Sequence, residues 1–372
     1  MYKKRIVAIE YIRGIAMLGV VGIHTGSSAL SNPLANIHLV ALLEIVTRFS
    51  VPIFFFVSAF GLFWSQDLSR PLDYKNYFKH RLRSVFIPYL VWSMFYMIHT
   101  TLLMGNFLVW HPSILIQTLF FGLASYHIYW LVILLWFYLL MPLWRYLLKK
   151  ILAQSLLWLT ILLFAQIIFD YYSSYKINVT NPPSSLFELF LQYRLNYWVL
   201  HYVFIFLFGG YCAQNYEAVR KWTSRHISVI TISFISSLSA MLGFYYFLLF
   251  TIHYTPEEAV NTAHQLSPIG ILYTLASSLF FIMWFESYSL PKSLGKLLSE
   301  LSKYSYPVYL VHPFFLYYLS LLLGQLNLLF TGPVTLCCYL LVVAISLVFG
   351  RAIKALSRPY PILGQLLTGS HK

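Results

Sequence analysis

An arginine and a histidine lie eleven residues apart in the first long apolar segment of the chain, Ile6 to Leu30. At about 100° per residue, Arg13 and His24 return to within roughly 20° of the same helix face, roughly 16 Å apart along the axis. Ionisable groups inside a membrane segment are costly and mark a site of function. An imidazole can take a proton from an alcohol and return it to a leaving group, the two proton transfers of acyl transfer. We expect His24 to be a general base on a face shared with Arg13; a structural role in a polar cavity is the alternative.

Small residues surround this histidine. Gly14, Gly19, Gly22 and Gly26 allow a neighbouring helix or a ligand to approach the backbone closely. The sequence has no obvious Gly-x-Ser-x-Gly motif of a serine nucleophile. Direct transfer from donor to acceptor therefore needs fewer assumptions than a covalent acyl-enzyme.

A basic stretch over residues 70–83 precedes the third apolar segment and ends in Arg81-Leu-Arg83. Planar guanidinium groups at a helix entrance can bind phosphates through two hydrogen bonds each. We therefore expect Arg81 and Arg83 to hold acyl-coenzyme A on the cytoplasmic side. Ordinary anchoring of basic residues at the cytoplasmic surface is the alternative, and we favour it for Lys75 and Lys79.

Arg48 lies inside the second apolar segment, four residues after Glu44. This spacing predicts an ion pair within one helix. Alternatively, Arg48 lines the reaction channel near a kink at Pro52, where it is a catalytic candidate for stabilising an oxyanion. Glu44 is then a candidate for contact with the substrate.

Further polar and aromatic residues suggest a substrate surface. Tyr309 and His312 share a helix face and could form a hydrogen-bonded pair that lines a cavity, although a structural role for His312 is the alternative. An aromatic belt at the membrane interface explains most of the outer aromatic residues, but a sugar-binding surface uses the same types. We take Trp130, Tyr309 and His312 as substrate candidates beside Glu44. The outer residues are Trp110, His111, Tyr126, His127, Trp130, Tyr193, Asn196, Tyr197 and Trp198.

Composition identifies the elements that must position these residues. The 372 residues are 59% hydrophobic and 10% charged, with a mean hydropathy of +0.71, as in a polytopic membrane protein. A net charge of +14 raises the possibility of nucleic-acid binding. Retention of Lys and Arg in cytoplasmic loops explains that charge without any nucleic-acid partner. Three cysteines form neither a disulfide framework nor a metal-binding spacing, so we expect no metal.

Ten apolar runs predict an all-α integral membrane protein with about ten transmembrane helices. Both termini are predicted to be cytoplasmic, because most of the 25 basic residues then lie inside, at 3–5, 70–83, 145–150, 220–225, 292–303 and 351–372. Lys176 and Arg194 remain outside. We expect 105–128 to be interfacial or re-entrant and 1–372 to be a single membrane domain with no soluble appendage. The runs are 7–30, 41–64, 84–104, 129–148, 152–172, 198–214, 228–253, 267–287, 304–325 and 331–350.

Over nearly its full length the chain resembles the membrane acyltransferase-3 family. The most specific element is Tyr11-Ile-Arg-Gly-Ile-Ala-Met-Leu-Gly-Val-Val-Gly-Ile-His24. Supporting elements are Ser50 to Ser58, Arg81-Leu-Arg83 before Ile87-Pro-Tyr89, Tyr129-Trp-Leu through Pro142, and Ser305 through His312-Pro. One departure is Ser58-Ala59, where family members often have Ser-Gly.

The resemblance implies a ten-helix enzyme that moves an acyl group, usually acetyl, from cytoplasmic acyl-coenzyme A to a hydroxyl of an extracytoplasmic glycan. It implies that His24 is the catalytic histidine, Arg13 its motif partner, and Arg81 with Arg83 the pair near the donor. Some relatives that modify peptidoglycan carry a soluble esterase-like domain after the membrane part, and we expect none in this chain. Length and local sequence are similar to the subgroup of biofilm poly-N-acetylglucosamine, for which succinyl transfer is proposed.

Two hypotheses of function follow. The first is an O-acyltransferase of the bacterial cytoplasmic membrane that uses acetyl- or succinyl-coenzyme A, with a glycan or lipid-linked sugar as acceptor, membrane lipids around it, and glycan synthase or export proteins as partners. The second is a transporter or flippase of a lipid-linked sugar or exopolysaccharide. We find no repeat or matched pair of interrupted helices that would support the second. An outer Arg194 could meet a succinyl carboxylate, although a solvated surface position is the simpler expectation.

Overall fold

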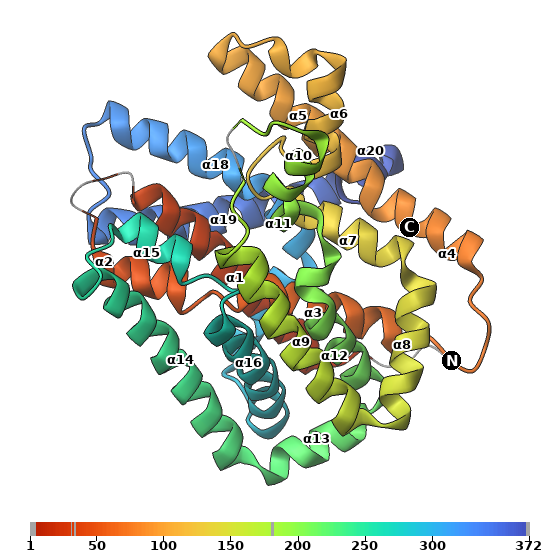
Figure 1. The fold of residues 1–372 in the computed structure, drawn as a ribbon. Helices are drawn as coiled ribbons and strands as arrows, with labels where there is room; N and C mark the ends of the chain where they lie inside the picture. The colour runs from red at the N-terminus through yellow and green to blue at the C-terminus, as the bar shows by residue number, and fades with distance from the viewer. Residues whose placement is uncertain (1–4, 31, 33–34, 180–181, 370–372) are drawn as a thin grey trace.

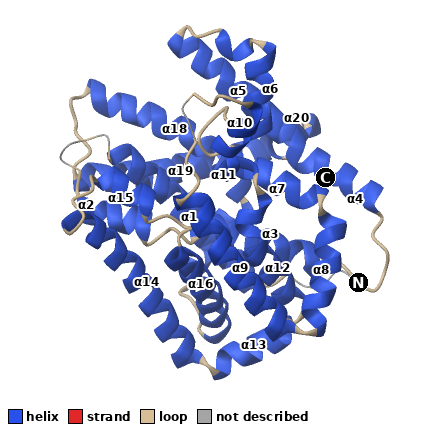
Figure 2. Ribbon diagram, in the orientation of Figure 1, coloured by secondary structure: helices blue, strands red, loops and turns tan. Residues whose placement is uncertain are grey.

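The chain folds into a bundle of α-helices joined by short loops (Figure 2). A computed structural model describes residues 5–30, 32, 35–179 and 182–369, and no strand occurs within these ranges. The predicted all-α class is therefore confirmed. Lys3, Lys4 and Lys372, three of the predicted cytoplasmic basic residues, lie outside the described ranges.

Eight helical segments of the described chain are long and apolar enough to cross a membrane. They correspond to eight of the ten predicted spans, so the hydropathy pattern locates most of the fold. They are α1 (Val7–Ala29), Ile37–Trp64 with α2 (Ile37–Val40) and α3 (Ser50–Trp64), Tyr74–Met104 with α4 (Tyr74–Arg81) and α5 (Ile87–Met104), α9 (Ser155–Tyr175), α14 (Ile227–Phe250), α16 (Pro268–Ser287), α18 (Ser305–Gln325) and α19 (Gly332–Leu356).

The other two predicted spans are not continuous long helices. The span predicted at 129–148 is broken into α7 (Tyr129–Leu139) and α8 (Met141–Ala153), which are bent by 71°. Pro142 lies in the first turn of α8, where a missing N–H costs no intrahelical hydrogen bond. The span predicted at 198–214 is a 3₁₀ turn followed by the short helix α12 (Val203–Gln214).

Short helices connect the long ones. The ten residues of α6 are too few to span a bilayer, in agreement with the interpretation of 105–128. The basic stretch before the third span is helical from Tyr74, where the Asp73 side chain caps the helix by accepting a hydrogen bond from the Asn76 N–H. These helices are α6 (Pro112–Phe121), α10 (Leu186–Gln192), α11 (Arg194–Tyr197), α13 (Tyr216–Arg225), α15 (Pro256–Thr262), α17 (Lys292–Lys303) and α20 (Pro361–Thr368).

The second span is interrupted near its middle. A π-helical turn over Ala41–Ile45 is followed by a turn at 46–49, and α3 then begins. The interruption thus comes one turn before Pro52, which lies in the first turn of α3. The hydroxyl of Tyr273 donates to the carbonyl of Val46 at 2.7 Å, so this irregular backbone is satisfied by a neighbouring helix.

Helix α1 lies in the centre of the bundle and packs against α3, α16, α17, α18 and α19 (Figure 1). Its glycines permit these contacts, as predicted. A Cβ at Gly14 would clash with the carbonyl of Leu298 in α17, and one at Gly19 would clash with the side chain of Ser50 in α3.

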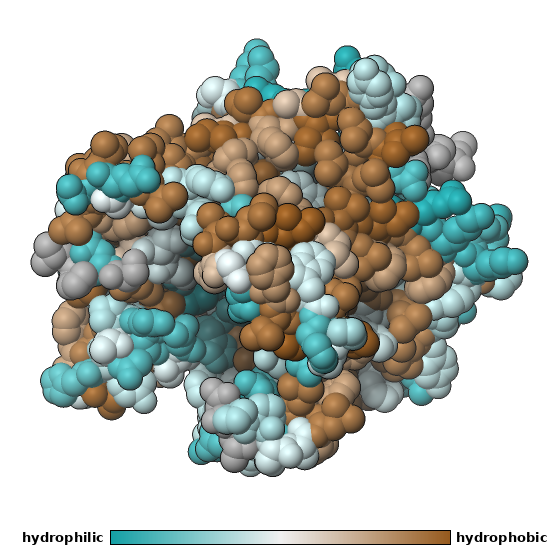
Figure 3. All heavy atoms as spheres, turned by 90° about the horizontal axis from the view of Figure 1, so that it is seen from above, coloured by the Kyte–Doolittle hydropathy of each residue, from teal (hydrophilic) through white to brown (hydrophobic). Residues whose placement is uncertain are grey.

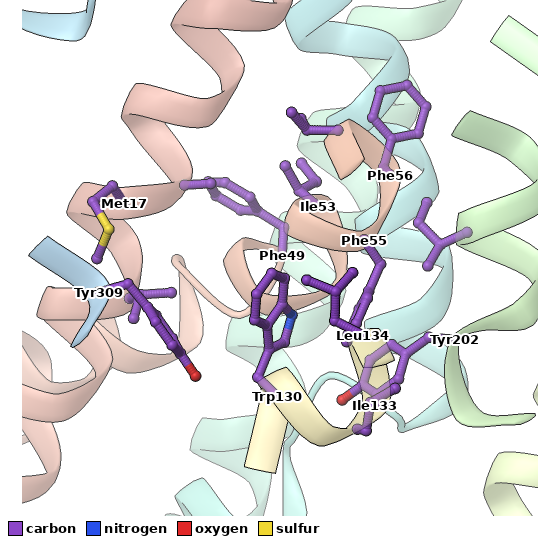
Figure 4. Close-up of a cluster of buried hydrophobic side chains, with 14 of the residues drawn as sticks. Met17, Phe49, Ile53, Phe55, Phe56, Trp130, Ile133, Leu134, Tyr202 and Tyr309 are labelled. Carbon is purple, nitrogen blue, oxygen red and sulfur yellow. The ribbon is translucent and has the colours of Figure 1, made fainter. Parts of the chain in front are cut away.

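Aromatic and aliphatic side chains fill the space beside α1. In Figure 4, Trp130 lies between Phe55 and Tyr309, and its ring centroid is 5.1 Å from that of Phe55 and 5.4 Å from that of Tyr309. The outer surface in Figure 3 carries broad hydrophobic areas, with hydrophilic residues gathered in patches. An apolar exterior of this kind is matched to lipid, and the chain is a multi-pass membrane protein.

Candidate active site

Basic helices gather at one end of the bundle, which we call the basic end. Tyr11 in the first half of α1 packs edge to face on Phe285 near the end of α16, with ring centroids 5.3 Å apart. Gly295 of α17 lies against the same tyrosine. Helix α13 packs on α16 at this level, where Arg220 pairs with Glu286 at 3.7 Å. The orientation predicted from charge sets the basic end toward the cytoplasm.

A cavity of about 690 Å³ extends along α1 from the basic end toward the opposite end. It has the size of a small-molecule site and combines apolar walls with a limited set of polar groups. Arg13 and His24 both line it, so the helical periodicity correctly predicts that they share a face. The polar and aromatic lining residues are Arg13, His24, Ser27, Ser28, Arg48, Phe54, Ser58, Arg81, Ser84, Tyr126, His127, Tyr129, Trp130, Tyr138, Gln265, Ser305, Tyr306 and Tyr309.

The basic end of the cavity carries Arg13 and Arg81. The guanidinium carbon of Arg81 lies 5.5 Å from the ring centroid of Tyr77 and 5.2 Å from that of Tyr138, two cation–π contacts. Its buried Nε has no hydrogen-bond partner among the described residues. Aromatic faces hold the cation but leave an N–H donor for an anion.

Arg83 occupies a different position from Arg81. It is exposed, and it does not line the cavity. The π-helical turn Leu82–Phe86 joins α4 to α5 without a break, so these two arginines project from one continuous helix. Of the two arginines predicted to hold the donor, Arg81 lines the cavity and Arg83 does not.

His24 lies toward the opposite end of the cavity, between two other rings. Its centroid is 4.6 Å from that of Tyr126 and 5.3 Å from that of His312. His127 lines the cavity beside it, and its ring centroid is 5.4 Å from that of His312. Within the described ranges, no group of three or more His, Cys, Asp or Glu side chains is placed to hold a metal ion.

Arg48 fulfils both interpretations of its position. Its Nη2 lies 3.0 Å from Glu44 Oε2 and donates to the carbonyl of Val260 at 2.9 Å, so the predicted ion pair is present and buried. Ser27 donates to the other carboxylate oxygen of Glu44 at 2.7 Å. Arg48 also lines the cavity, whereas Glu44 lies behind it.

The predicted hydrogen bond between the side chains of Tyr309 and His312 is wrong. The Tyr309 hydroxyl donates to the carbonyl of His127, and the two rings lie 6.1 Å apart. His312 Nδ1 instead lies 2.8 Å from the carbonyl oxygen of Tyr309. Tyr309 and Trp130 line the cavity, and the fully buried His312 lies behind it.

Two cavity residues come from the turn between α6 and α7. Tyr126 and His127 are brought there by a chain reversal at Gly122, which has a φ of 69°. Their aromatic type was the only signal in the sequence, and it placed them with an interfacial belt. The other members of that set, Trp110, His111, Tyr193, Asn196, Tyr197 and Trp198, do not line the cavity.

The loop between α15 and α16 closes the cavity near Arg48 with Gln265. The neighbouring His264 accepts a hydrogen bond from the Leu266 N–H at 3.0 Å and stacks on Tyr175. Burial, with a smaller contribution from Arg48, lowers the pKa of His264 to about 4. This imidazole is therefore neutral at pH 7, and it does not add to the positive charge of Arg48.

A second buried polar cluster lies outside the cavity, on α9 and the turn before α12. His201 Nδ1 lies 2.6 Å from Asp170, and its Nε2 lies 3.3 Å from the Ser173 hydroxyl. This order matches a Ser-His-Asp triad, but all three side chains are buried and none lines the cavity. Arg194 donates to the Ser173 carbonyl at 2.6 Å and is 9% exposed, so a solvated outer position for it is wrong. The cluster fastens the turn before α12 to α9.

The sequence model of the acyltransferase 3 family, described as an acyltransferase domain, matches residues 6–351. The chain belongs to the acyltransferase 3 family. It is similar to YfiQ of Bacillus subtilis strain 168, described as a "putative membrane-bound acyltransferase", with 24% identity over 98% of this chain and 96% of that protein. No solved structure matches the chain. As a member of the acyltransferase 3 family, the protein is a membrane enzyme that transfers acyl groups.

Proposed function

We propose that the enzyme moves a small acyl group, acetyl or succinyl, from cytoplasmic acyl-coenzyme A to a carbohydrate hydroxyl on the far side of the membrane. One observation carries this proposal: a single cavity has arginines at its basic end and a histidine toward its other end. A donor and an acceptor that enter from opposite sides could then meet within one protein.

In this proposal His24 is the general base. It accepts the proton as the O–H bond of the acceptor breaks, and the oxygen forms a bond to the thioester carbonyl carbon. The negative charge that develops on the carbonyl oxygen meets Arg48, whose buried Nε has no partner among the described residues. The C–S bond then breaks, and the leaving sulfur receives the proton from His24. No metal and no acyl-enzyme take part.

The donor is proposed to bind through Arg13 and Arg81. The free Nε of Arg81 supports this, because a guanidinium fork binds phosphate oxygens well. Arg83 is exposed on the same helix and would contact only a part of the coenzyme outside the cavity.

The acceptor is proposed to bind against aromatic faces near His24. Trp130, Tyr126 and Tyr309 supply these faces in the cavity, and Glu44 and His312 act from behind it. The acceptor class is an extracytoplasmic glycan or lipid-linked sugar, with the biofilm polymer poly-N-acetylglucosamine as one member. We place the enzyme in the bacterial cytoplasmic membrane, with residues 1–372 as one membrane domain beside glycan synthase or export partners.

Binding of radiolabelled acetyl- and succinyl-coenzyme A to the protein in lipid nanodiscs tests the proposal. We expect saturable binding that is lost in Arg81→Ala and kept in His24→Ala. Lys79→Ala removes an exposed basic residue of the same helix α4 and is the matched control, which should also keep binding. Transfer to a glycan should be lost in His24→Ala, by a factor of about 10² or more. Transfer at the wild-type rate by a properly inserted His24→Ala would overturn the mechanism. If neither donor binds, the transporter hypothesis is favoured instead.

A further inference from the structure

His312 in α18 has its ring orientation set by the residue that follows it. Pro313 has no backbone N–H, so the carbonyl of Tyr309, four residues earlier, loses its helical donor. His312 Nδ1 lies 2.8 Å from that carbonyl oxygen and 3.1 Å from the carbonyl oxygen of Val308. A carbonyl only accepts hydrogen bonds, so Nδ1 carries the proton.

The other ring nitrogen is therefore an acceptor. A neutral imidazole has one N–H, so a proton on Nδ1 leaves a lone pair on Nε2. His312 Nε2 is buried and has no hydrogen-bond partner among the described residues. An unmade hydrogen bond of this kind costs free energy in a folded protein and calls for an explanation.

The environment of His312 points to His24. The two ring centroids are 5.3 Å apart with an interplanar angle of 27°, and of these two residues only His24 lines the cavity. The nearby carboxylate of Glu44 is already paired with Arg48 and Ser27. We therefore consider His312, rather than Glu44, as the hydrogen-bond acceptor for His24.

We propose that His312 is a positioning residue for His24, an inference that rests on the proposed function. One nitrogen of neutral His24 takes the proton of the acceptor hydroxyl, and the other already carries an N–H, which in the reacting state donates a hydrogen bond to the Nε2 lone pair of His312. No covalent bond forms or breaks at His312. Its role corresponds to that of the aspartate in a Ser-His-Asp triad, which orients a histidine and stabilises its charged form.

A neutral partner suits this position. Arg48 lines the cavity near His24, and a positively charged neighbour on the other side would oppose proton uptake. Because its Nδ1 proton is held by backbone carbonyls, His312 offers only an acceptor to its surroundings. The motif His312-Pro313 thereby keeps the proton of His312 on Nδ1, and its Nε2 can accept a hydrogen bond from His24.

Two substitutions of His312 distinguish positioning from packing. His312→Gln retains an amide oxygen acceptor near the position of Nε2, whereas His312→Phe retains the ring volume without an acceptor. We expect kcat of acyl transfer to fall by less than about tenfold in His312→Gln and by about 10² in His312→Phe, with KM unchanged in both. A packing role would favour the phenylalanine. Equal or higher kcat in His312→Phe, or an effect confined to KM, would overturn the proposal.

A third variant weakens the hydrogen bond that holds the His312 tautomer and leaves His312 itself unchanged. Pro313→Ala supplies a backbone N–H that competes with Nδ1 for the Tyr309 carbonyl, and we expect kcat to fall several-fold. Pro307→Ala in the first turn of α18 is the matched control and should keep the wild-type kcat. An unchanged kcat in Pro313→Ala would contradict the inference that Pro313 fixes the tautomer of His312.

The same assay with His24→Ala separates the two proposals. Loss of transfer in His24→Ala together with wild-type transfer in His312→Phe contradicts the positioning role alone. Wild-type transfer in His24→Ala contradicts the general-base mechanism itself. Thermal unfolding in nanodiscs shows which variants are folded, and only folded variants enter the comparison.

Discussion

The charged side chains of the site are held by partners that leave part of each group free. Arg48 pairs with Glu44 and with a backbone carbonyl, yet its Nε has no partner among the described residues. Arg81 is held by two aromatic faces and likewise keeps a free Nε. Such sites combine rigidity with unsatisfied donors, as binding sites for anions require.

A double-mutant cycle on Glu44 and Arg48 measures the strength of their pair. We expect Glu44→Gln and Arg48→Met each to lower the free energy of unfolding by about 3 kcal/mol, because each leaves a buried charge or dipole unpaired. The double variant should lose about 2 kcal/mol less than the sum of the two. Unfolding in mild detergent gives these values, and simple additivity would show that the pair contributes nothing.

At the residue scale, the sequence predicted shared faces well and individual partners poorly. The periodicity of one helix correctly placed Arg13 with His24, and the spacing of four correctly paired Glu44 with Arg48. The partner of Tyr309 is a carbonyl from the turn before α7, which no spacing within α18 can reveal. Contacts between distant segments need the tertiary structure.

At the element scale, the site is built where helices are interrupted. The second span breaks at 46–49 beside Arg48, and the turn at 122–128 inserts His127. Hydropathy correctly predicted eight of the ten spans, because a long apolar run needs only its own composition to be recognised. It did not predict the 71° bend after Leu139, because the flanking residues are equally apolar. Only Pro142 signalled it.

Close packing of α12 on α3 depends on a glycine. A Cβ at Gly209 would clash with the carbonyl oxygen of Phe56, whereas a Cβ at Gly243 in α14 meets nothing within 4 Å. We expect Gly209→Ala to lower the free energy of unfolding by about 1–3 kcal/mol despite the better helix propensity of alanine. The matched Gly243→Ala should be neutral or raise it by up to about 1 kcal/mol. Equal melting temperatures of the two variants would contradict the predicted clash.

At the scale of the whole molecule, charge predicts the orientation of the bundle. Helices α4, α13 and α17 are rich in basic residues and lie at the basic end of the bundle, which also holds Arg13 and Arg81. Basic segments are retained in the cytoplasm, so we expect the basic end to be cytoplasmic. Helix α15, with two acidic residues in its first turn, is then expected on the outer side of the membrane.

Single cysteines test this orientation in a variant without Cys212, Cys337 and Cys338. Lys221 in α13 and Glu257 in α15 are both exposed, so a cysteine at either position is accessible to solvent. A membrane-impermeant maleimide should label Glu257→Cys in intact cells and Lys221→Cys only after permeabilisation. The reverse pattern would invert the topology and, with it, the proposed sides of donor and acceptor.

A cavity that runs along a membrane-spanning helix is also a path along which ions could leak. Protons and sodium ions that crossed along it would dissipate the gradients that the membrane maintains. The guanidinium groups of Arg13 and Arg81 line this path, and neither forms an ion pair with a carboxylate among the described residues. Fixed positive charge at a constriction repels cations, as in pores that exclude protons. Under the proposed function, the same arginines that attract an anionic donor would also oppose the passage of cations along the cavity.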